Sequence, residues 1–198
     1  MIITFAGFKG GVGKTTAAVH LAGVLATTIR TVLLVDADPN RSSCGWSRRG
    51  SLPFTVLPES DGLREIKNFQ FTVLDTEARP NAEDLQELAA ASDLLILPTT
   101  PDALAVDALV KTLSNIKTSN YRILLTMTPP PPGRSAEELQ QELVEAKRNV
   151  FNTKIRRFVV YQKAAAGGCL SWNIKDPKAN ETMLDFQNFG SEVLNGKI

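Results

Sequence analysis

The most constraining feature of this sequence is a glycine-rich segment near its start, residues 8–16, which read FKGGVGKTT. An apolar run over residues 2–6 precedes it and predicts a buried strand, and residues 17–26 after it predict a helix. Glycine has no Cβ, so the backbone of such a loop can take left-handed angles and wrap closely around a phosphate. Strand, glycine loop and helix in this order predict a phosphate-binding loop, with backbone N–H groups and the helix dipole directed at the anion.

Individual side chains of this loop suit individual parts of a nucleoside triphosphate. Lys14 is placed to reach the β- and γ-phosphates, and the Thr15 hydroxyl is placed to hold Mg²⁺. A glycine-rich turn without a ligand is the alternative, and the strand-loop-helix context argues against it. The expected nucleotide contacts are Lys9, Gly10, Gly11, Val12, Gly13, Lys14, Thr15 and Thr16.

The loop departs from the usual pattern, because Phe8 stands where the first glycine is expected and Lys9 adds a second lysine. In both respects it resembles the deviant Walker A motif of the ParA/MinD family of ATPases. The resemblance implies that Lys9 reaches across a dimer interface to the nucleotide of a partner subunit. It also implies that ATP is the nucleotide.

Two later apolar runs end in aspartate, one at Asp36 and the other at Asp75. In open α/β sheets, ligands bind at the carboxyl ends of strands, where these side chains would lie. Residues 36–39, Asp-Ala-Asp-Pro, resemble the family's switch segment, although an Asp-Pro turn without a ligand is the alternative. The resemblance implies that Asp38 orients the attacking water, that Asp36 supports the Mg²⁺ shell, and that Asp75 is the Walker B residue. The expected metal site is therefore Thr15, Asp36 and Asp75, and the expected catalytic residues are Lys9, Lys14 and Asp38.

Two departures follow the aspartates: Asn40 stands where the family usually has glutamine, and residues 77–80 read EARP. Met127 and Pro129 lie where the family often contacts adenine. The last third of the chain is locally basic, which is typical of a solvated helix face. The resemblance offers another interpretation, a patch that binds the DNA backbone without sequence specificity. The residues concerned are Lys147, Arg148, Lys154, Arg156, Arg157 and Lys163.

Composition bounds the remaining choices. The chain has 198 residues and a net charge of +1, so a DNA contact would have to be local, and residues 1–198 are expected to form one domain. No apolar run approaches the roughly 18 residues that a membrane-spanning helix needs, and the start lacks the pattern of a signal peptide. Cys44 and Cys169 lie far apart and predict reduced thiols in a cytoplasmic protein. The single histidine, His20, is expected to be structural.

Strands and helices alternate along the whole chain, which predicts an α/β P-loop NTPase with a mostly parallel, doubly wound sheet flanked by helices. Asn81 is expected to cap one helix, Pro101 to be the first residue of the next, and Ser135 to begin a capping box. The expected strands after the first helix cover 31–36, 54–57, 71–76, 93–98, 121–127 and 154–161, and the expected helices cover 61–67, 81–91, 101–116, 135–149 and 185–194. Residues 41–53 are expected to be irregular, with a helix turn that packs Trp46 on the core as the alternative.

The resemblance implies a Mg²⁺-dependent ATPase that forms an ATP-dependent homodimer and binds double-stranded DNA of the nucleoid non-specifically. An adaptor of ParB or McdB type would stimulate hydrolysis, and the cargo would be a plasmid or a carboxysome. A membrane-associated regulator like MinD is one alternative, but residues 186–194 contain no lysine or arginine, and no membrane partner is expected. A metabolic P-loop enzyme of the dethiobiotin-synthetase kind is another, and the switch segment argues against it.

Overall fold

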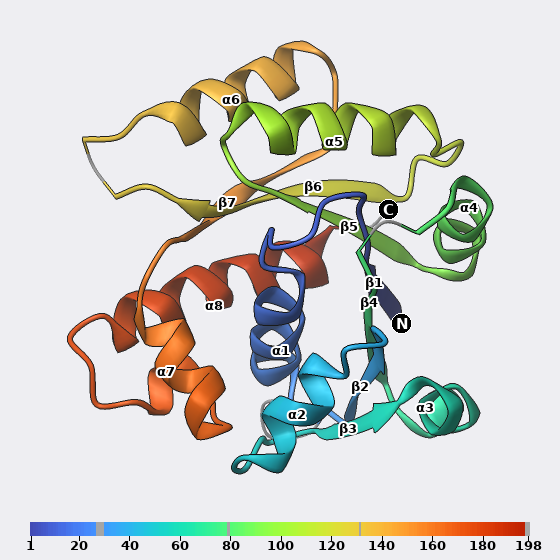
Figure 1. Cartoon of the computed structure of the whole chain (residues 1–198), viewed down its shortest axis with the longest axis vertical. Helices are drawn as coiled ribbons and strands as arrows, with labels where there is room; N and C mark the ends of the chain where they lie inside the picture. The colour runs from blue at the N-terminus through green and yellow to red at the C-terminus, as the bar shows by residue number, and fades with distance from the viewer. Residues whose placement is uncertain (27–29, 79, 131, 197–198) are drawn as a thin grey trace.

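The computed structural model describes residues 1–26, 30–78, 80–130 and 132–196. Its centre is a sheet of seven parallel strands in the order β3-β2-β4-β1-β5-β6-β7 (Figure 1). This confirms the expected parallel α/β fold. The strands are β1 (Ile2–Phe5), β2 (Val32–Ala37), β3 (Thr55–Pro58), β4 (Phe71–Thr76), β5 (Leu94–Thr99), β6 (Tyr121–Thr128) and β7 (Val150–Arg156).

Helices cover both faces of the sheet, as a doubly wound fold requires (Figure 1). One layer contains α1 (Lys14–Leu25), α2 (Ser42–Arg48), α7 (Val160–Gly167), the short turn η2 (Ser171–Asn173) and α8 (Ala179–Asn195). The other contains α3 (Glu59–Glu65), the turn η1 (Ile66–Asn68), α4 (Ala82–Ala91), α5 (Ala103–Ser114) and α6 (Ser135–Glu145). In β5, Leu94 and Ile96 face the first layer while Leu95 and Leu97 face the second. Burial on both faces explains why the central strands read as unbroken apolar runs.

Two expectations for the chain's elements are wrong in a way that matters for the site. Residues 41–53 are not irregular throughout, because α2 occupies Ser42–Arg48 and buries Trp46, which agrees with the alternative of a helix turn packed on the core. The last strand does not cover 154–161 but ends at Arg156, and α7 begins at Val160. The segment from Phe158 to Tyr161 is rich in aromatic and β-branched residues, which favour strands, but packing onto the first helix layer overrides that preference.

Helix starts were predicted with mixed success. Asn81 is confirmed as a cap, since its Oδ1 accepts the backbone N–H of Asp84 at 2.8 Å. The cap of α5 is Asp102 rather than a start at Pro101, with its carboxylate accepting the N–H of Ala105 at 3.0 Å. Ser135 is the first residue of α6 and not its cap, and α6 ends at Glu145 instead of 149.

His20 lies at the centre of the first helix layer and is fully buried. Its Nδ1 donates to the Thr16 carbonyl at 2.8 Å, and its Nε2 accepts the Ser171 N–H at 3.1 Å, so the ring is held as one neutral tautomer. Burial lowers the pKa of His20 to about 4. Its structural role is confirmed. Aromatic rings surround it, with Phe186 stacked at 4.8 Å and Trp46, Tyr161 and Trp172 meeting it edge-on.

Candidate functional site

The glycine loop joins the end of β1 to the start of α1 at the carboxyl edge of the sheet. Gly11 and Gly13 have φ values of 77° and 80°, which L side chains rarely adopt, so the loop depends on glycine at these positions. Gly13 is the N-terminal boundary residue of α1, and no described side chain caps that helix. The N–H groups of its first turn are thereby left for an external anion.

The two lysines of the loop point in different directions. Lys14 is only 7% exposed, and its Nζ lies 3.4 Å from the Lys9 carbonyl. Burial lowers the pKa of Lys14, while the charges of Asp75 and Asp38 act in the opposite direction. The Lys9 side chain instead extends outward, and its Nζ contacts Asp102 Oδ1 at 2.8 Å. One cation therefore faces the predicted phosphate site, and the other lies at the surface.

The two strand-ending aspartates are direct neighbours, because Asp36 of β2 pairs in register with Asp75 of β4. Both are fully buried. Asp36 uses both oxygens to accept backbone N–H groups, from Asp38 at 3.2 Å and from Cys44 at 2.8 Å. Asp75 accepts the Ser43 hydroxyl at Oδ2 (2.7 Å), whereas no donor within the described part of the chain reaches its buried Oδ1.

The surroundings of Asp75 suit a cation. Burial raises the pKa of the Asp75 carboxyl to about 6, against the lowering effects of the Ser43 and Thr15 hydroxyls and the Lys14 ammonium. A buried carboxylate oxygen without a donor, beside the hydroxyl of Thr15, fits Mg²⁺, which prefers oxygen ligands and keeps several waters. Asp36 fits less well, since the backbone already occupies both of its oxygens. The metal roles of Thr15, Asp36 and Asp75 remain predictions.

Asp38 leaves β2 at the same edge and is partly exposed. Its Oδ1 accepts both the backbone N–H and the side-chain amide of Asn40, at 2.8 and 2.9 Å. The asparagine that replaces the family's usual glutamine is therefore the residue that orients this carboxylate. The charge of Asp38 also opposes the lowering of the Lys14 pKa by burial.

A cavity of about 530 Å³ opens beside the first turn of α1. Its volume lies within the range of small-molecule sites. Met127 lines it, as expected of a base contact, but Pro129 does not and lies instead on a separate groove against α8. The remaining walls come from the loop and the start of α1, from β6, from the end of β7, and from α7 with the segment that leads into it. Their residues are Gly13, Thr16, Ala17, Thr126, Ile155, Arg156, Arg157, Phe158, Val159, Tyr161, Gln162 and Ala165.

With this geometry described, the chain can be compared with known proteins. The family model for the CobQ/CobB/MinD/ParA nucleotide-binding domain matches residues 3–169. The chain belongs to this family. The resemblance to ParA/MinD proteins that the loop suggested is therefore confirmed.

Three similar proteins, one from sequence and two from structure, show how far the similarity extends. "Maintenance of carboxysome distribution protein A" of Gloeobacter kilaueensis is 36% identical over 197 residues, covering 93% of this chain and 90% of the relative. The structure of apo McdA from Cyanothece has a TM-score of 0.74 at 18% identity and covers 98% of this chain and 99% of its own. A putative plasmid partition protein from Borrelia burgdorferi, bound to AMPPNP, has a TM-score of 0.72 at 20% identity over 100% of this chain and 99% of its own. The two structures share the fold.

The structure separates the six basic residues of the predicted DNA patch. Lys147 and Arg148 lie just before the first residue of β7. Arg156 and Arg157 lie at its last residue and just after it, at the opposite end of the strand. These residues do not form a single patch. Lys154 and Lys163 are engaged by acids, with ion pairs to Glu137 at 3.6 Å and to Asp176 at 2.7 Å.

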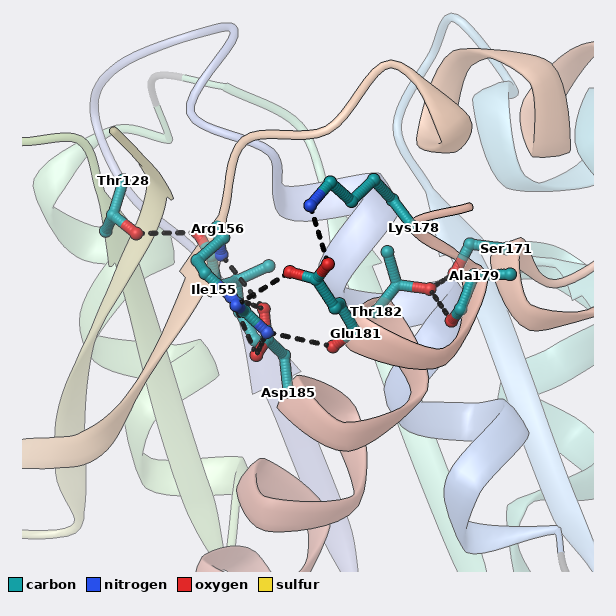
Figure 2. A network of polar contacts seen from close by, with 9 residues as sticks. All are labelled: Thr128, Ile155, Arg156, Ser171, Lys178, Ala179, Glu181, Thr182 and Asp185. Carbon is teal, nitrogen blue, oxygen red and sulfur yellow. Dashed lines mark hydrogen bonds and ion pairs between the residues drawn. The ribbon is translucent and has the colours of Figure 1, made fainter. Parts of the chain in front are cut away.

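Arg156 is the most heavily bonded of the six (Figure 2). Its guanidinium binds the Asp185 carboxylate through Nε and Nη2 and the Glu181 carboxylate through Nη1, at 2.8 to 3.2 Å. Glu181 also accepts Lys178 at 2.6 Å. The Arg156 side chain therefore holds α8 against the end of β7, and this network argues against a DNA contact for it.

The sequence interpretation missed three polar groups at this edge: Ser43, Asn40 as the partner of Asp38, and Asp102 as the partner of Lys9. Ser43 and Asn40 directly follow the switch segment, so their closeness to the aspartates was the available signal. Asp102 is more than 90 residues from Lys9, and only the neighbouring positions of β1 and β5 bring them together. Arg79, in the unusual segment after Asp75, lies outside the described residues.

Proposed function

We propose that this protein is a Mg²⁺-dependent ATPase that forms an ATP-dependent homodimer and positions or partitions a cargo on the nucleoid. The observation that carries the proposal is the opposite orientation of two lysines on one loop. Lys14 is buried under the influence of Asp38 and Asp75, as a ligand of its own subunit's phosphates would be. Lys9 extends to the surface, as a residue that completes a partner's site would.

The chain's own groups suffice to place a nucleotide. The N–H groups of the loop and the first turn of α1 hold the phosphates, and Lys14 pairs with the β/γ oxygens. The base lies in the 530 Å³ cavity, next to Met127. Thr15 and Asp75 would hold Mg²⁺, which neutralises the charge that develops on the phosphate oxygens.

Hydrolysis requires an oriented water and a cation at the transferring phosphoryl group. Asp38 orients the water, and the two hydrogen bonds from Asn40 hold Asp38 in place. Lys9 of the second subunit supplies the cation. Arginine fingers that act in this way contribute about 10³- to 10⁵-fold, so a lysine delivered only by the partner couples turnover to dimerisation.

The partners follow from the relatives. An identity of 36% over 93% of this chain relates it to a protein named for carboxysome distribution, which supports a carboxysome or plasmid cargo and an adaptor of ParB or McdB type. Non-specific DNA binding would use exposed basic residues, and Lys147 with Arg148 before β7 form one such pair, duplicated by the dimer. No helix in the described part of the chain is long and apolar enough to cross a membrane. We place the protein in the cytoplasm, on the nucleoid.

Binding to random-sequence duplex DNA tests the proposal, in ATP, in ADP and without nucleotide, together with the mass of the protein in each state. Wild type is expected to dimerise and bind DNA only with ATP, in a salt-sensitive way. Asp38→Ala should accumulate the ATP dimer, and Lys9→Ala should lose turnover by at least about 10³-fold. Lys67→Ala, an exposed lysine on η1, is the matched control.

The results also separate the alternatives. If the protein hydrolysed ATP but stayed monomeric and bound no DNA in any nucleotide state, the proposal that it positions a cargo on the nucleoid would be overturned. ATP-dependent flotation with liposomes would then favour a MinD-like regulator, and turnover stimulated by a small metabolite would favour a metabolic enzyme. Unchanged turnover in Lys9→Ala would remove the role of the second subunit.

A further inference from the structure

The hydrogen bond between Ser43 and Asp75 belongs neither to the switch segment, residues 36–39, nor to the glycine loop. Ser43 lies in the first turn of α2, and its hydroxyl donates to Asp75 Oδ2 at 2.7 Å. Both side chains are fully buried. The bond joins residues 32 positions apart in the sequence, so it depends on how α2 is docked.

The docking of α2 is specified at both of its ends. At its start, the N–H of Cys44 donates to Asp36 Oδ2 at 2.8 Å, which satisfies a first-turn N–H as a capping side chain would. At its end, Trp46 Nε1 donates to the Cys169 carbonyl at 3.0 Å, and Arg49 Nε donates to the Ala165 carbonyl at 2.7 Å. The position of the Ser43 hydroxyl is therefore set by a helix that is hydrogen-bonded to its neighbours at both ends.

A carboxylate at the end of a strand can rotate about its side-chain torsions unless a neighbour fixes it. The Ser43 hydroxyl occupies Oδ2, and Oδ1 is the oxygen left over, buried and without a donor among the described residues. The groups that act on this carboxylate from the loop are Thr15 and Lys14. One oxygen of Asp75 is thus bonded to α2, and the other accepts no hydrogen bond from the described residues.

We propose that Ser43 is a positioning residue for Asp75, which fixes the carboxylate so that Oδ1 alone serves the Mg²⁺ shell of the bound nucleotide. The inference rests on the proposed function, because it assigns Ser43 to the same nucleotide site. Groups that orient metal ligands in this way change metal affinity or activity by about 10- to 100-fold when removed.

The test is a Mg²⁺ titration of ATP binding, measured with a fluorescent ATP analogue, in wild type, Ser43→Ala and Ser43→Cys. Cysteine fills the site but donates only weakly, so it separates the lost hydrogen bond from the lost volume. Ser42→Ala is the matched control, because Ser42 is exposed in the same helical turn. Affinity in EDTA and thermal unfolding without Mg²⁺ are measured alongside.

The Mg²⁺ concentration for half-maximal binding is expected to rise about 10-fold or more in both Ser43 variants, with ATP affinity in EDTA within twofold of wild type. Ser42→Ala should match wild type throughout. A lower unfolding temperature with an unchanged Mg²⁺ requirement would make the bond merely structural and overturn the proposal. The same conclusion would follow if only Ser43→Ala, and not Ser43→Cys, needed more Mg²⁺.

A second readout does not depend on nucleotide. In a nucleotide-free crystal structure of Ser43→Ala, the Asp75 carboxylate is expected to leave its wild-type orientation. An unchanged orientation would overturn the positioning role. If wild type itself bound no ATP, with or without Mg²⁺, the proposed function would fail, and this structure would still decide what Ser43 does to Asp75.

Discussion

Asp36 and Asp75 stand opposite each other on neighbouring strands, yet their surroundings differ completely. The Asp36 carboxylate accepts two backbone N–H groups and thereby holds the turn after β2 and the start of α2. The Asp75 carboxylate accepts one hydroxyl and keeps a buried oxygen without a donor among the described residues. Paired positions on two neighbouring strands therefore differ in how far their carboxylate oxygens are satisfied by the described residues.

The difference teaches how such a site can be recognised. A buried carboxylate whose oxygens are all satisfied stabilises the fold, because its hydrogen bonds replace those lost to water. A buried carboxylate with an unsatisfied oxygen destabilises the fold unless a ligand is present. A carboxylate with an unsatisfied oxygen is therefore the better candidate for a ligand-binding group. Substitution of Asp75 should preserve or raise the free energy of unfolding, and substitution of Asp36 should lower it.

The largest effect is expected for Asp75→Asn. The amide cannot supply the negative charge that the Mg²⁺ shell requires, so ATP turnover should fall by at least about 100-fold. In the absence of Mg²⁺ and nucleotide, the same variant should be at least as stable as wild type at pH 7, because it no longer buries a charge. Steady-state turnover and denaturant unfolding measure the two effects. If Asp75→Asn lost stability as well as activity, Asp75 would be a carboxylate that stabilises the fold, as Asp36 does.

The pH dependence of stability should follow the same contrast. The pKa of Asp75 is raised from 3.8 to about 6 in the fold, so the folded state binds this proton more tightly than the unfolded state. Its contribution to stability is therefore lost as pH rises from about 4 to 6, by up to about 3 kcal/mol. The difference between wild type and Asp75→Asn, measured in EDTA, isolates it. Equal slopes for the two proteins over this range would contradict the expectation.

Asp36→Asn should act mainly on stability. An amide can accept with only one oxygen, so either the partly buried N–H of Asp38 or the buried N–H of Cys44 loses its partner. We expect a loss of about 1–3 kcal/mol in the free energy of unfolding. The affinity for ATP at a temperature where the variant is folded should change less than in Asp75→Asn. If Asp36→Asn instead weakened Mg²⁺-dependent ATP binding as much as Asp75→Asn does, while the free energy of unfolding stayed unchanged, Asp36 would also be a metal ligand.

The smallest effect is expected at a third carboxylate, Asp102, which is exposed. It caps α5 and pairs with Lys9, and these contacts lower its pKa. Asparagine keeps the cap and removes the charge, so Asp102→Asn should change stability by less than about 1 kcal/mol. Asp102→Ala should cost about 1 kcal/mol more, because it also removes the cap. Urea unfolding at low and high salt separates the two contributions, since only the ion pair is screened.

The sequence predicted those parts of the fold that depend on local pattern. Strands such as β4 and β5 are continuous apolar runs that are buried on both faces, and they were placed within a residue of their ends. α2 was only the alternative to an irregular segment, because Ser42–Arg48 contains poor helix formers and its stability comes from Asp36 and from the burial of Trp46. α7 was missed because Val160 and Tyr161 favour strands unless distant residues pack against them.

The site was predictable only in part, for the same reason. Lys14, Thr15, Asp36, Asp38 and Asp75 could be named because they follow strands or glycines at recognisable spacings. The unequal use of Asp36 and Asp75 could not, since it depends on where α2 docks. Nor could the separation of Arg148 from Arg156, which follows from the length of β7 between them.

The lone histidine has a practical consequence. Because His20 is the chain's single histidine, its ring gives one set of signals in a magnetic resonance spectrum without any label placed by mutation. We expect the aromatic rings around it to shift those signals away from the usual range, and a pKa of about 4 predicts that they stay constant across physiological pH. The ring bonds to Thr16 and contacts Tyr161, and both of these residues line the cavity predicted for the base. His20 therefore lies one contact away from this cavity, and its resonance should move when a ligand fills the cavity.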